Sequence, residues 1–165
     1  MNDLSDPSTL DAETKVSERP HKHELRLWLR LLTCANLVEA LVRTRLRAEF
    51  AATLPRFDLM AQLEKAPGGM SLGQLSRRMM VSNGNVTGLV ERLVAQGQVE
   101  RTPHPTDRRA ATVRLTQPGR AAFAAMAKAH EGWVAEAFAG LAPDDGPALM
   151  AALARLKSSV RKVTP

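Results

Sequence analysis

Amide and hydroxyl side chains gather at the start of one predicted helix, over residues 82–96. Asn83, Asn85 and Thr87 lie in its first turns, and Ser82 stands where it can cap the helix. An asparagine can contact adenine N6 and N7 together, and a threonine methyl can touch the thymine methyl. We therefore predict that this helix reads base edges in DNA. The plainer interpretation is that the asparagines only cap the helix.

Two glycines lie on the outer face of the same helix. Gly84 and Gly88 stand opposite the apolar stripe, and each costs the helix about 1 kcal/mol relative to alanine. Close approach to a duplex would account for that cost, whereas the alternative is that the glycines are incidental. Arg92 falls on the same outer face. The apolar stripe itself is made by Val86, Leu89, Val90 and Leu93.

A second short helix is predicted just before this one, so the two form a helix-turn-helix. Ser71 and Gln74 have the spacing of a capping box, with an apolar face following them. Residues 81–84 form the turn. In helix-turn-helix proteins the second helix enters the major groove, which agrees with the base-reading role predicted for residues 82–96.

Two predicted strands, 99–102 and 109–115, flank a charged segment that contains prolines. We interpret them as a β-hairpin. An arginine that projects from a hairpin can enter a narrow minor groove, and Asp107 could hold such an arginine in place by a bidentate ion pair. The alternative is a solvated turn whose ion pair contributes almost nothing. The residues predicted to contact DNA here are Arg101, Asp107, Arg108 and Arg109, with Arg114 also able to reach phosphate.

Long helices flank this unit on both sides. Residues 23–50 contain neither glycine nor proline, and their apolar side chains cover several faces. Such a helix is buried on several sides, which suggests contact with both its own core and another subunit. The last predicted helix, 144–161, has apolar residues at heptad-like spacing. They are Leu149, Leu153, Leu156, Val160 and Val163; packing on the preceding helix of the same chain is the alternative.

These elements predict a mainly α-helical fold with a small β-hairpin wing, dimerised through its N- and C-terminal helices. Residues 1–20 are expected to form a disordered acidic tail. Residues 21–50 and 120–165 would supply the dimerisation helices, and residues 51–119 the winged helix-turn-helix that binds DNA.

Charge and composition narrow the function further. The 165 residues carry a formal net charge of +6. Residues 1–20 have five acidic and two basic side chains, a net charge of −3, so the remaining residues carry +9. A basic remainder favours a polyanionic partner. A single cysteine excludes an internal disulfide, and no apolar run is long enough to span a bilayer. We expect a cytoplasmic protein with no membrane association, cofactor or bound metal.

No catalytic constellation is visible in the sequence, so we do not expect an enzyme. A glycine-rich phosphate loop, a nucleophile elbow and a His-Glu-x-x-His pattern are all absent. Cys34 lies in an apolar helix, where a thiol is usually inert. Two alternatives stay open: a redox-sensing regulator that acts through Cys34, and a winged helix that contacts proteins rather than DNA.

Residues 70–120, MSLGQLSRRMMVSNGNVTGLVERLVAQGQVERTPHPTDRRAATVRLTQPGR, resemble the multiple antibiotic resistance regulators (MarR family). The resemblance extends over about residues 25–162. It implies a winged-helix homodimer that binds a palindromic operator, most often as a repressor. It also implies that Arg109 enters the minor groove, that Asp107 steadies it and that Arg108 assists. Gln98 departs from the large apolar residue usual in the family.

Within that family, residues 45–64 are similar to regulators of hydroxycinnamate and related aromatic-acid breakdown, some of which respond to a coenzyme A thioester. We expect a small anionic aromatic ligand, or such a thioester, between the pairing helices and the reading unit. There it would change the spacing of the two reading heads. Arg43, Arg45 and Arg47 could meet its charge, although solvation is the plainer interpretation. The predicted effector contacts are Trp28, Phe50, Phe57 and Met60, with ordinary core packing as the alternative.

Overall fold

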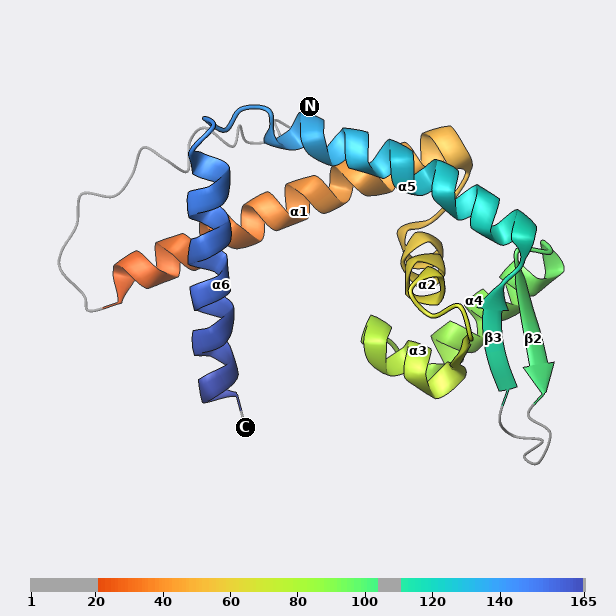
Figure 1. The fold of residues 1–165 in the computed structure, drawn as a ribbon. Helices are drawn as coiled ribbons and strands as arrows, with labels where there is room; N and C mark the ends of the chain where they lie inside the picture. The colour runs from red at the N-terminus through yellow and green to blue at the C-terminus, as the bar shows by residue number, and fades with distance from the viewer. Residues whose placement is uncertain (1–20, 104–110, 165) are drawn as a thin grey trace, which may run out of the picture. The chain divides into compact units, whose positions relative to one another are not determined.

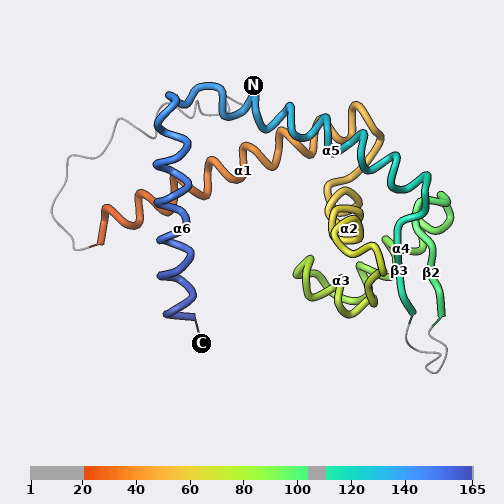
Figure 2. Tube along the Cα trace, viewed as in Figure 1, coloured from red at the N-terminus to blue at the C-terminus, as the bar shows by residue number. Residues whose placement is uncertain are grey.

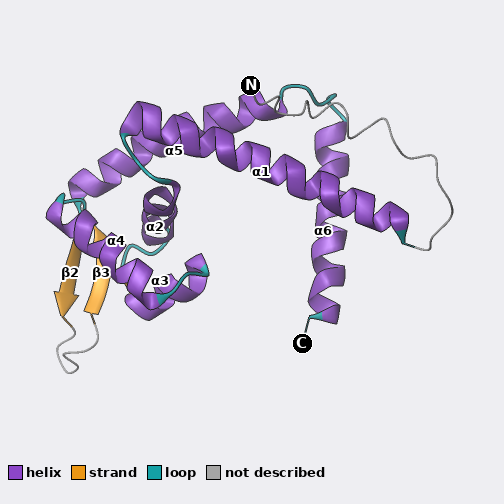
Figure 3. Cartoon of the chain, turned by 180° about the vertical axis from the view of Figure 1, so that it is seen from behind, coloured by secondary structure: helices purple, strands orange, loops and turns teal. Residues whose placement is uncertain are grey.

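The computed structural model describes residues 21–103 and 111–164. The chain divides between Leu37 and Val38 into a short N-terminal unit and a larger unit. Figure 3 shows by colour that the described elements are mostly helical. No helix in these ranges combines the length and apolar character that crossing a bilayer requires.

Helix α1 (Lys22–Phe50) begins in the first unit and ends in the second, which confirms the helix predicted for residues 23–50. Only Val42 and Leu46 of this helix are buried. The predicted burial on several sides is therefore not achieved within one chain. Large apolar side chains that stay exposed in the first unit are Leu25, Leu27, Trp28, Leu29, Leu32 and Leu37.

The predicted helix-turn-helix follows in the larger unit, after helix α2 (Leu54–Glu64). Thr53 caps α2, and Pro55 lies in its first turn. Helix α3 (Leu72–Met79) starts with the predicted capping box, because Ser71 and Gln74 exchange side-chain and backbone hydrogen bonds. Helix α4 (Asn83–Ala95) comes next, and its range confirms the prediction for residues 82–96 to within one residue at each end. Figure 2 traces α2, α3 and α4 in succession.

Strands β2 (Val99–Pro103) and β3 (Ala111–Leu115) pair antiparallel and confirm the hairpin. Figure 1 shows them running side by side. A third strand, β1 (Met70–Ser71), adds to the other edge of β3 and was not predicted from the sequence. Gly69 makes this pairing feasible: its φ is +86°, and a Cβ there would overlap Thr112 and lie 2.8 Å from the carbonyl oxygen of Val113.

Two helices complete the chain, and both confirm the sequence prediction in outline. Helix α5 (Gln117–Phe138) is capped by Thr116, whose hydroxyl accepts a 3.0 Å hydrogen bond from the backbone N–H of Gly119. Gly119 lies so close to the α4–β2 junction that a Cβ would overlap the carbonyl oxygen of Gln98. Helix α6 (Asp145–Val163) has no buried residue in the single chain.

One apolar core holds the larger unit together. It receives side chains from the C-terminal part of α1, from α2 to α5 and from all three strands. Phe50 and Trp133 link α1 to α5, with ring centroids 6.2 Å apart, and Arg45 forms an ion pair with Glu136 between the same helices. The fully buried large side chains are Leu46, Leu59, Met60, Leu63, Leu75, Leu93 and Met126, together with four valines.

Candidate nucleic-acid interface

Helix α4 is held in one rotation by its apolar stripe. Val86, Leu89, Val90 and Leu93 are all buried, so the opposite side of the helix must face outward. The Ser82 hydroxyl accepts a hydrogen bond from the backbone N–H of Asn85 at 3.4 Å, which confirms Ser82 as the N-cap. The start of the helix is therefore fixed by both packing and capping.

The turn between α3 and α4 is tied by two hydrogen bonds. Ser76 donates its hydroxyl to the carbonyl oxygen of Val81 at 2.6 Å, and the Val81 N–H returns a bond to Ser76 O at 3.2 Å. Met80 occupies the left-handed region with φ 56° and is 92% exposed. Because these bonds bridge the turn, α3 sets the direction in which α4 projects.

The predicted base-reading residues lie at the exposed start of α4. Ser82, Asn83 and Asn85 are exposed. The Thr87 hydroxyl donates a 2.9 Å hydrogen bond to the carbonyl oxygen of Asn83, four residues earlier. The Thr87 proton is thus already used within the helix, which leaves the asparagine amides as the donors free to reach a base edge.

The glycines of α4 are not required by packing. A Cβ added at Gly84 or at Gly88 would meet no heavy atom within 4 Å. Both positions therefore border open space, and the absence of a side chain lowers the profile of the helix on its outer side. This leaves room for the close approach to a duplex that the sequence predicts.

The described part of the wing carries two exposed arginines, and one of them forms an ion pair. Arg101 lies on β2 and is exposed, whereas Arg114 on β3 forms an ion pair with Glu100, its cross-strand neighbour. The contact of Arg114 with phosphate that the sequence allows would have to compete with this pair. The predicted hairpin tip, Asp107, Arg108 and Arg109, lies outside the described residues.

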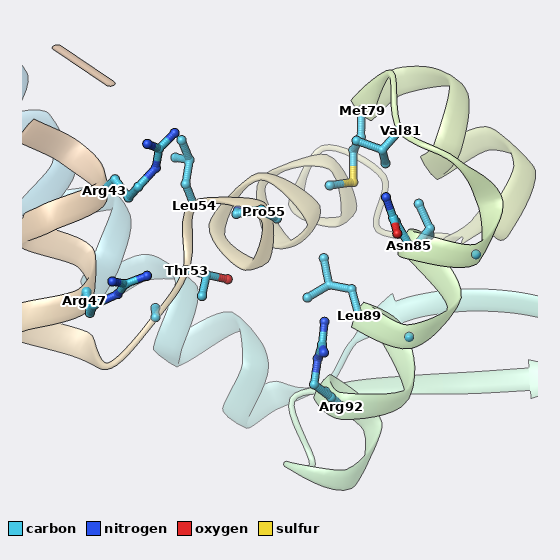
Figure 4. A pocket seen from close by; sticks show the side chains of 14 residues that line it. Arg43, Arg47, Thr53, Leu54, Pro55, Met79, Val81, Asn85, Leu89 and Arg92 are labelled. Atoms are coloured by element: carbon cyan, nitrogen blue, oxygen red, sulfur yellow. The ribbon is translucent and has the colours of Figure 1, made fainter. Parts of the chain in front are cut away.

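A pocket of about 570 Å³ opens between the end of α1, the start of α2 and one side of α4. Figure 4 shows Arg43 and Arg47 on the α1 side, with Asn85, Leu89 and Arg92 on the α4 side. Apolar groups line much of the space between these walls; they are Ala52, Leu54, Pro55, Met79, Val81, Val86 and Leu89. The volume is within the range of small-molecule sites.

None of the four effector contacts predicted from the sequence lines this pocket. Phe57 and Met60 are buried in the core, at 8% and 0% exposure, and Phe50 packs on Trp133. Trp28 is exposed in the N-terminal unit. The sequence analysis named Arg43, Arg45 and Arg47 as able to meet an anion. Arg43 and Arg47 line the pocket, whereas Arg45 does not line it and pairs with Glu136.

Cys34 and Asp58 are the other reactive or ionisable groups that bear on the sequence predictions in the described part of the chain. Cys34 is exposed in the single chain, so the apolar packing expected around it is not supplied within one chain. No cluster of three or more histidine, cysteine, aspartate or glutamate side chains suited to a metal occurs within residues 21–103 and 111–164.

Partial burial raises the pKa of Asp58, and the nearby Glu39 carboxylate raises it further, while His130 acts in the opposite direction.

Comparison with known sequences finds the MarR family over residues 52–111, which include the helix-turn-helix and the first part of β3. The transcriptional activatory protein BadR of Rhodopseudomonas palustris is 34% identical over 105 residues. That match covers 62% of this chain and 59% of BadR, so the chain spans about three fifths of the length of this relative. The name of BadR agrees with the prediction of a regulator rather than an enzyme.

Solved structures share the fold over most of its length. A MarR family transcriptional regulator from Silicibacter pomeroyi is 33% identical, with a TM-score of 0.72 and coverage of 87% of this chain and 99% of the other. Sco3205, a MarR family regulator from Streptomyces coelicolor crystallised in complex with DNA, has a TM-score of 0.72 at 20% identity. The second match covers 88% of this chain and 92% of Sco3205, and at that identity it shows the fold alone.

Proposed function

Because the chain belongs to the MarR family of transcriptional regulators, we propose that it binds a palindromic DNA operator as a homodimer and is released by a small anionic aromatic ligand. The observation that carries the proposal is the capped, outward-facing start of α4, where Asn83 and Asn85 are exposed. The complex of the structurally similar Sco3205 with DNA supports the same partner.

Asn85 is the residue that we assign to base reading, with Ser82 and Asn83 beside it. The major groove admits an α-helix, and an amide can pair with adenine in a bidentate manner. Gly88 would let the helix approach closely, and the Thr87 methyl remains available to thymine. Arg92 and Arg101 would contact phosphates, which fix orientation rather than sequence.

The hairpin tip would supply the second contact. We assign Arg109 to the minor groove, Asp107 to holding its guanidinium, and Arg108 to a supporting role. Arg101, exposed on β2, would extend this contact along the backbone. A narrow minor groove attracts arginine through its enhanced negative potential.

Dimerisation through the terminal helices is supported by the apolar surface that they leave exposed. Helix α6 buries none of its residues, and Leu149, Leu156 and Val160 are 40–50% exposed. The N-terminal half of α1 is exposed in the same way. Residues 21–50 and 120–165 would form the pairing helices and residues 51–119 the reading head, so that two heads meet half-sites about 10 bp apart.

Repression follows if the bound dimer obstructs a promoter, and we assign this role. BadR is named as an activatory protein, so activation is the outcome that a reporter assay must exclude. We assign the ligand to the aromatic acids or their coenzyme A thioesters, because residues 45–64 are similar to regulators of aromatic-acid breakdown. We assign its place of action to the cytoplasm.

Selection of duplexes from a random library tests the function directly. The selected duplex should contain an inverted repeat, and its affinity should fall steeply with salt, because phosphate contacts release counterions. A shuffled duplex of the same composition is the control. Equal affinity for the two duplexes would reject sequence-specific binding and would favour a winged helix that contacts proteins.

A further inference from the structure

Asn83 is the only asparagine of the chain that a glycine follows. Asn83 and Gly84 lie in the first turn of α4, and both are exposed. A Cβ added at Gly84 would meet no heavy atom within 4 Å, so no side chain hinders an approach to the Gly84 backbone nitrogen from that side. In an Asn-Gly pair this nitrogen can attack the carbon of the asparagine amide and close a five-membered imide ring. The start of α4 therefore carries the reactants of a deamidation.

The hydrogen bonds of the helix do not engage the Gly84 N–H. The first N–H groups of an α-helix have no carbonyl acceptor within the helix. Ser82 instead holds the next two N–H groups: its hydroxyl accepts from Asn85 at 3.4 Å, and its carbonyl oxygen accepts from Val86 at 3.2 Å. Rotation about the Asn83 Cα–C bond, which brings the side chain to the nitrogen, separates Ser82 from α4 and so breaks these two bonds.

Thr87 makes the Gly84 nitrogen more reactive. The Thr87 hydroxyl donates a 2.9 Å hydrogen bond to the carbonyl oxygen of Asn83, which belongs to the same peptide group as the Gly84 N–H. A donor at this oxygen polarises the peptide group, so the N–H gives up its proton to hydroxide more readily. The reactive nitrogen is the deprotonated one, and we therefore expect the reaction to accelerate as the pH rises.

Two other exposed asparagines lack this arrangement and provide internal controls. Asn85 is followed by Val86, whose branched side chain is fully buried and whose N–H is bonded to Ser82. Asn36 lies in the interior of α1, where each N–H bonds the carbonyl oxygen four residues earlier. Exposure of an asparagine alone therefore does not select a site; the following nitrogen does.

We propose that Asn83 deamidates spontaneously and that this conversion ends DNA reading by α4. The deprotonated Gly84 nitrogen bonds to the carbon of the Asn83 side-chain amide, the bond from that carbon to the amide nitrogen breaks, and ammonia leaves. Water then adds to one of the two imide carbonyls and opens the ring, which leaves either an aspartate or an isoaspartate residue. The reaction consumes one water molecule and needs no oxidant, reductant or enzyme.

Either product changes the surface that a duplex would meet. The amide donor of Asn83 is lost, and a carboxylate takes its place. A negative charge at a helix N-terminus is favourable to the helix, so α4 stays folded. The same charge repels DNA phosphates, and isoaspartate also adds a backbone carbon between Ser82 and Gly84. This part of the inference rests on the proposed function, since it needs DNA to bind at the start of α4.

Mass spectrometry of the aged full-length protein tests the chemistry. Trypsin releases residues 79–92 as one peptide that contains both Asn83 and Asn85, so fragmentation compares the two within one sample. After incubation without DNA at mildly alkaline pH, conversion should be found at Asn83 and not at Asn85, and it should slow as the pH is lowered. A sample digested before incubation corrects for conversion during digestion. An unconverted Asn83, or equal conversion of the two asparagines, would overturn the proposal.

Variants at the neighbouring positions test the geometry. Gly84→Ala places a methyl group beside the attacking nitrogen and should leave Asn83 largely unconverted over the same period, while the Cβ fits the fold. Ser82→Ala removes the cap that opposes the rotation and should speed conversion by a factor of about 2–30, which corresponds to the loss of an N-cap. A Gly84→Ala protein that converts as fast as the unmodified one would show that the Gly84 nitrogen is not the nucleophile.

Operator binding tests the consequence. Asn83→Asp should weaken binding to the selected operator by about tenfold or more, because an amide contact is replaced by repulsion. Asn83→Ala is the matched control, since it loses the amide without gaining charge, and it should bind more tightly than Asn83→Asp. Bound operator should also protect Asn83 from conversion in the unmodified protein. An Asn83→Asp protein with undiminished affinity, or conversion at the same rate in saturating operator, would overturn the inference.

The two hypotheses fail in different ways. If freshly prepared unmodified protein binds no duplex, the proposed function is wrong, whereas the peptide analysis still decides whether Asn83 deamidates. If the fresh protein binds its operator and the aged protein, with Asn83 converted, binds equally well, the proposed function holds and the inference is wrong.

Discussion

The Arg56 guanidinium donates a 2.8 Å hydrogen bond to the side-chain oxygen of Gln98, which lies 42 residues later in the sequence. The bond ties the first turn of α2 to the junction between α4 and β2. It gives a physical reason for the polar Gln98 at a position where the family resemblance implies a large apolar residue. Arg56 Nε is buried and has no partner within the described residues, so this single bond is the main compensation for the guanidinium.

Gln98→Leu should lower the free energy of unfolding by about 1–3 kcal/mol, because the partly buried Arg56 loses its hydrogen-bond acceptor. Urea denaturation of the single variants and of the pair Arg56→Met with Gln98→Leu measures the coupling. The double variant should recover most of the loss. A Gln98→Leu protein as stable as the unmodified one would show that the bond contributes nothing.

Asn85→Ala should reduce discrimination between the selected operator and a shuffled duplex by about 1–3 kcal/mol, the energy of a bidentate base contact. Fluorescence anisotropy on both duplexes measures this difference. Gln96→Ala is the matched control, because Gln96 is an exposed amide at the opposite end of α4. Equal losses on the two duplexes would reject base reading by Asn85.

Gly88→Ala should separate folding from binding. The added Cβ meets no neighbour, so the free energy of unfolding should rise by up to about 1 kcal/mol. Operator affinity should fall, because the methyl group stands between α4 and the duplex. Gly132→Ala in α5 also places a Cβ in open space and should raise stability without affecting DNA binding. Undiminished operator affinity in Gly88→Ala would mean that the helix does not approach DNA on this side.

Arg109→Ala should weaken operator binding and make it less sensitive to salt, because a minor-groove guanidinium also counts among the groups that displace counterions. Analytical ultracentrifugation should show the same oligomeric state as for the unmodified protein. If the operator affinity and the salt slope equal those of the unmodified protein, the proposed contact of Arg109 with DNA is wrong.

The raised pKa of Asp58 predicts a pH dependence of stability. A carboxyl that holds its proton more tightly when folded stabilises the fold below its usual pKa near 3.8, and this contribution is lost as the pH rises through the folded-state pKa. Asp58→Asn should therefore raise the melting temperature at neutral pH and flatten its fall above pH 4. Melting curves at a series of pH values provide the measurement, and a lower melting temperature at neutral pH would contradict the assignment.

Local hydrogen bonding explains why so many boundaries could be predicted from the sequence. The capping box at Ser71 and the N-caps at Ser82 and Thr116 depend only on residues within three positions, and all three are confirmed. Strand β1 could not be found in this way, because its two residues become a strand only by pairing with Val113 and Thr112. Gly69 before it allows the pairing, but a glycine by itself does not indicate a strand.

The pocket was harder to predict because its charged walls come from distant parts of the chain. Arg47 and Arg92 are brought together only when α1, α2 and α4 pack around one core, and no periodicity links them. Phe57 was predicted to contact the effector because it is aromatic. It is instead buried in the core, where its ring centroid lies 5.5 Å from that of Phe123. The predicted residues of α4 fared better, since one apolar stripe decides which side faces outward.

Gly119 has a mechanical consequence. With no side chain between them, the backbone of α5 lies directly on the carbonyl of Gln98, and there is no rotamer to absorb a displacement. Because the two backbones are in direct contact, a tilt of the first turn of α5 displaces the base of the hairpin and the last turn of α4 as well. A substitution at this glycine would therefore separate these segments, although Gly119 is not among the residues that we assign to DNA contact.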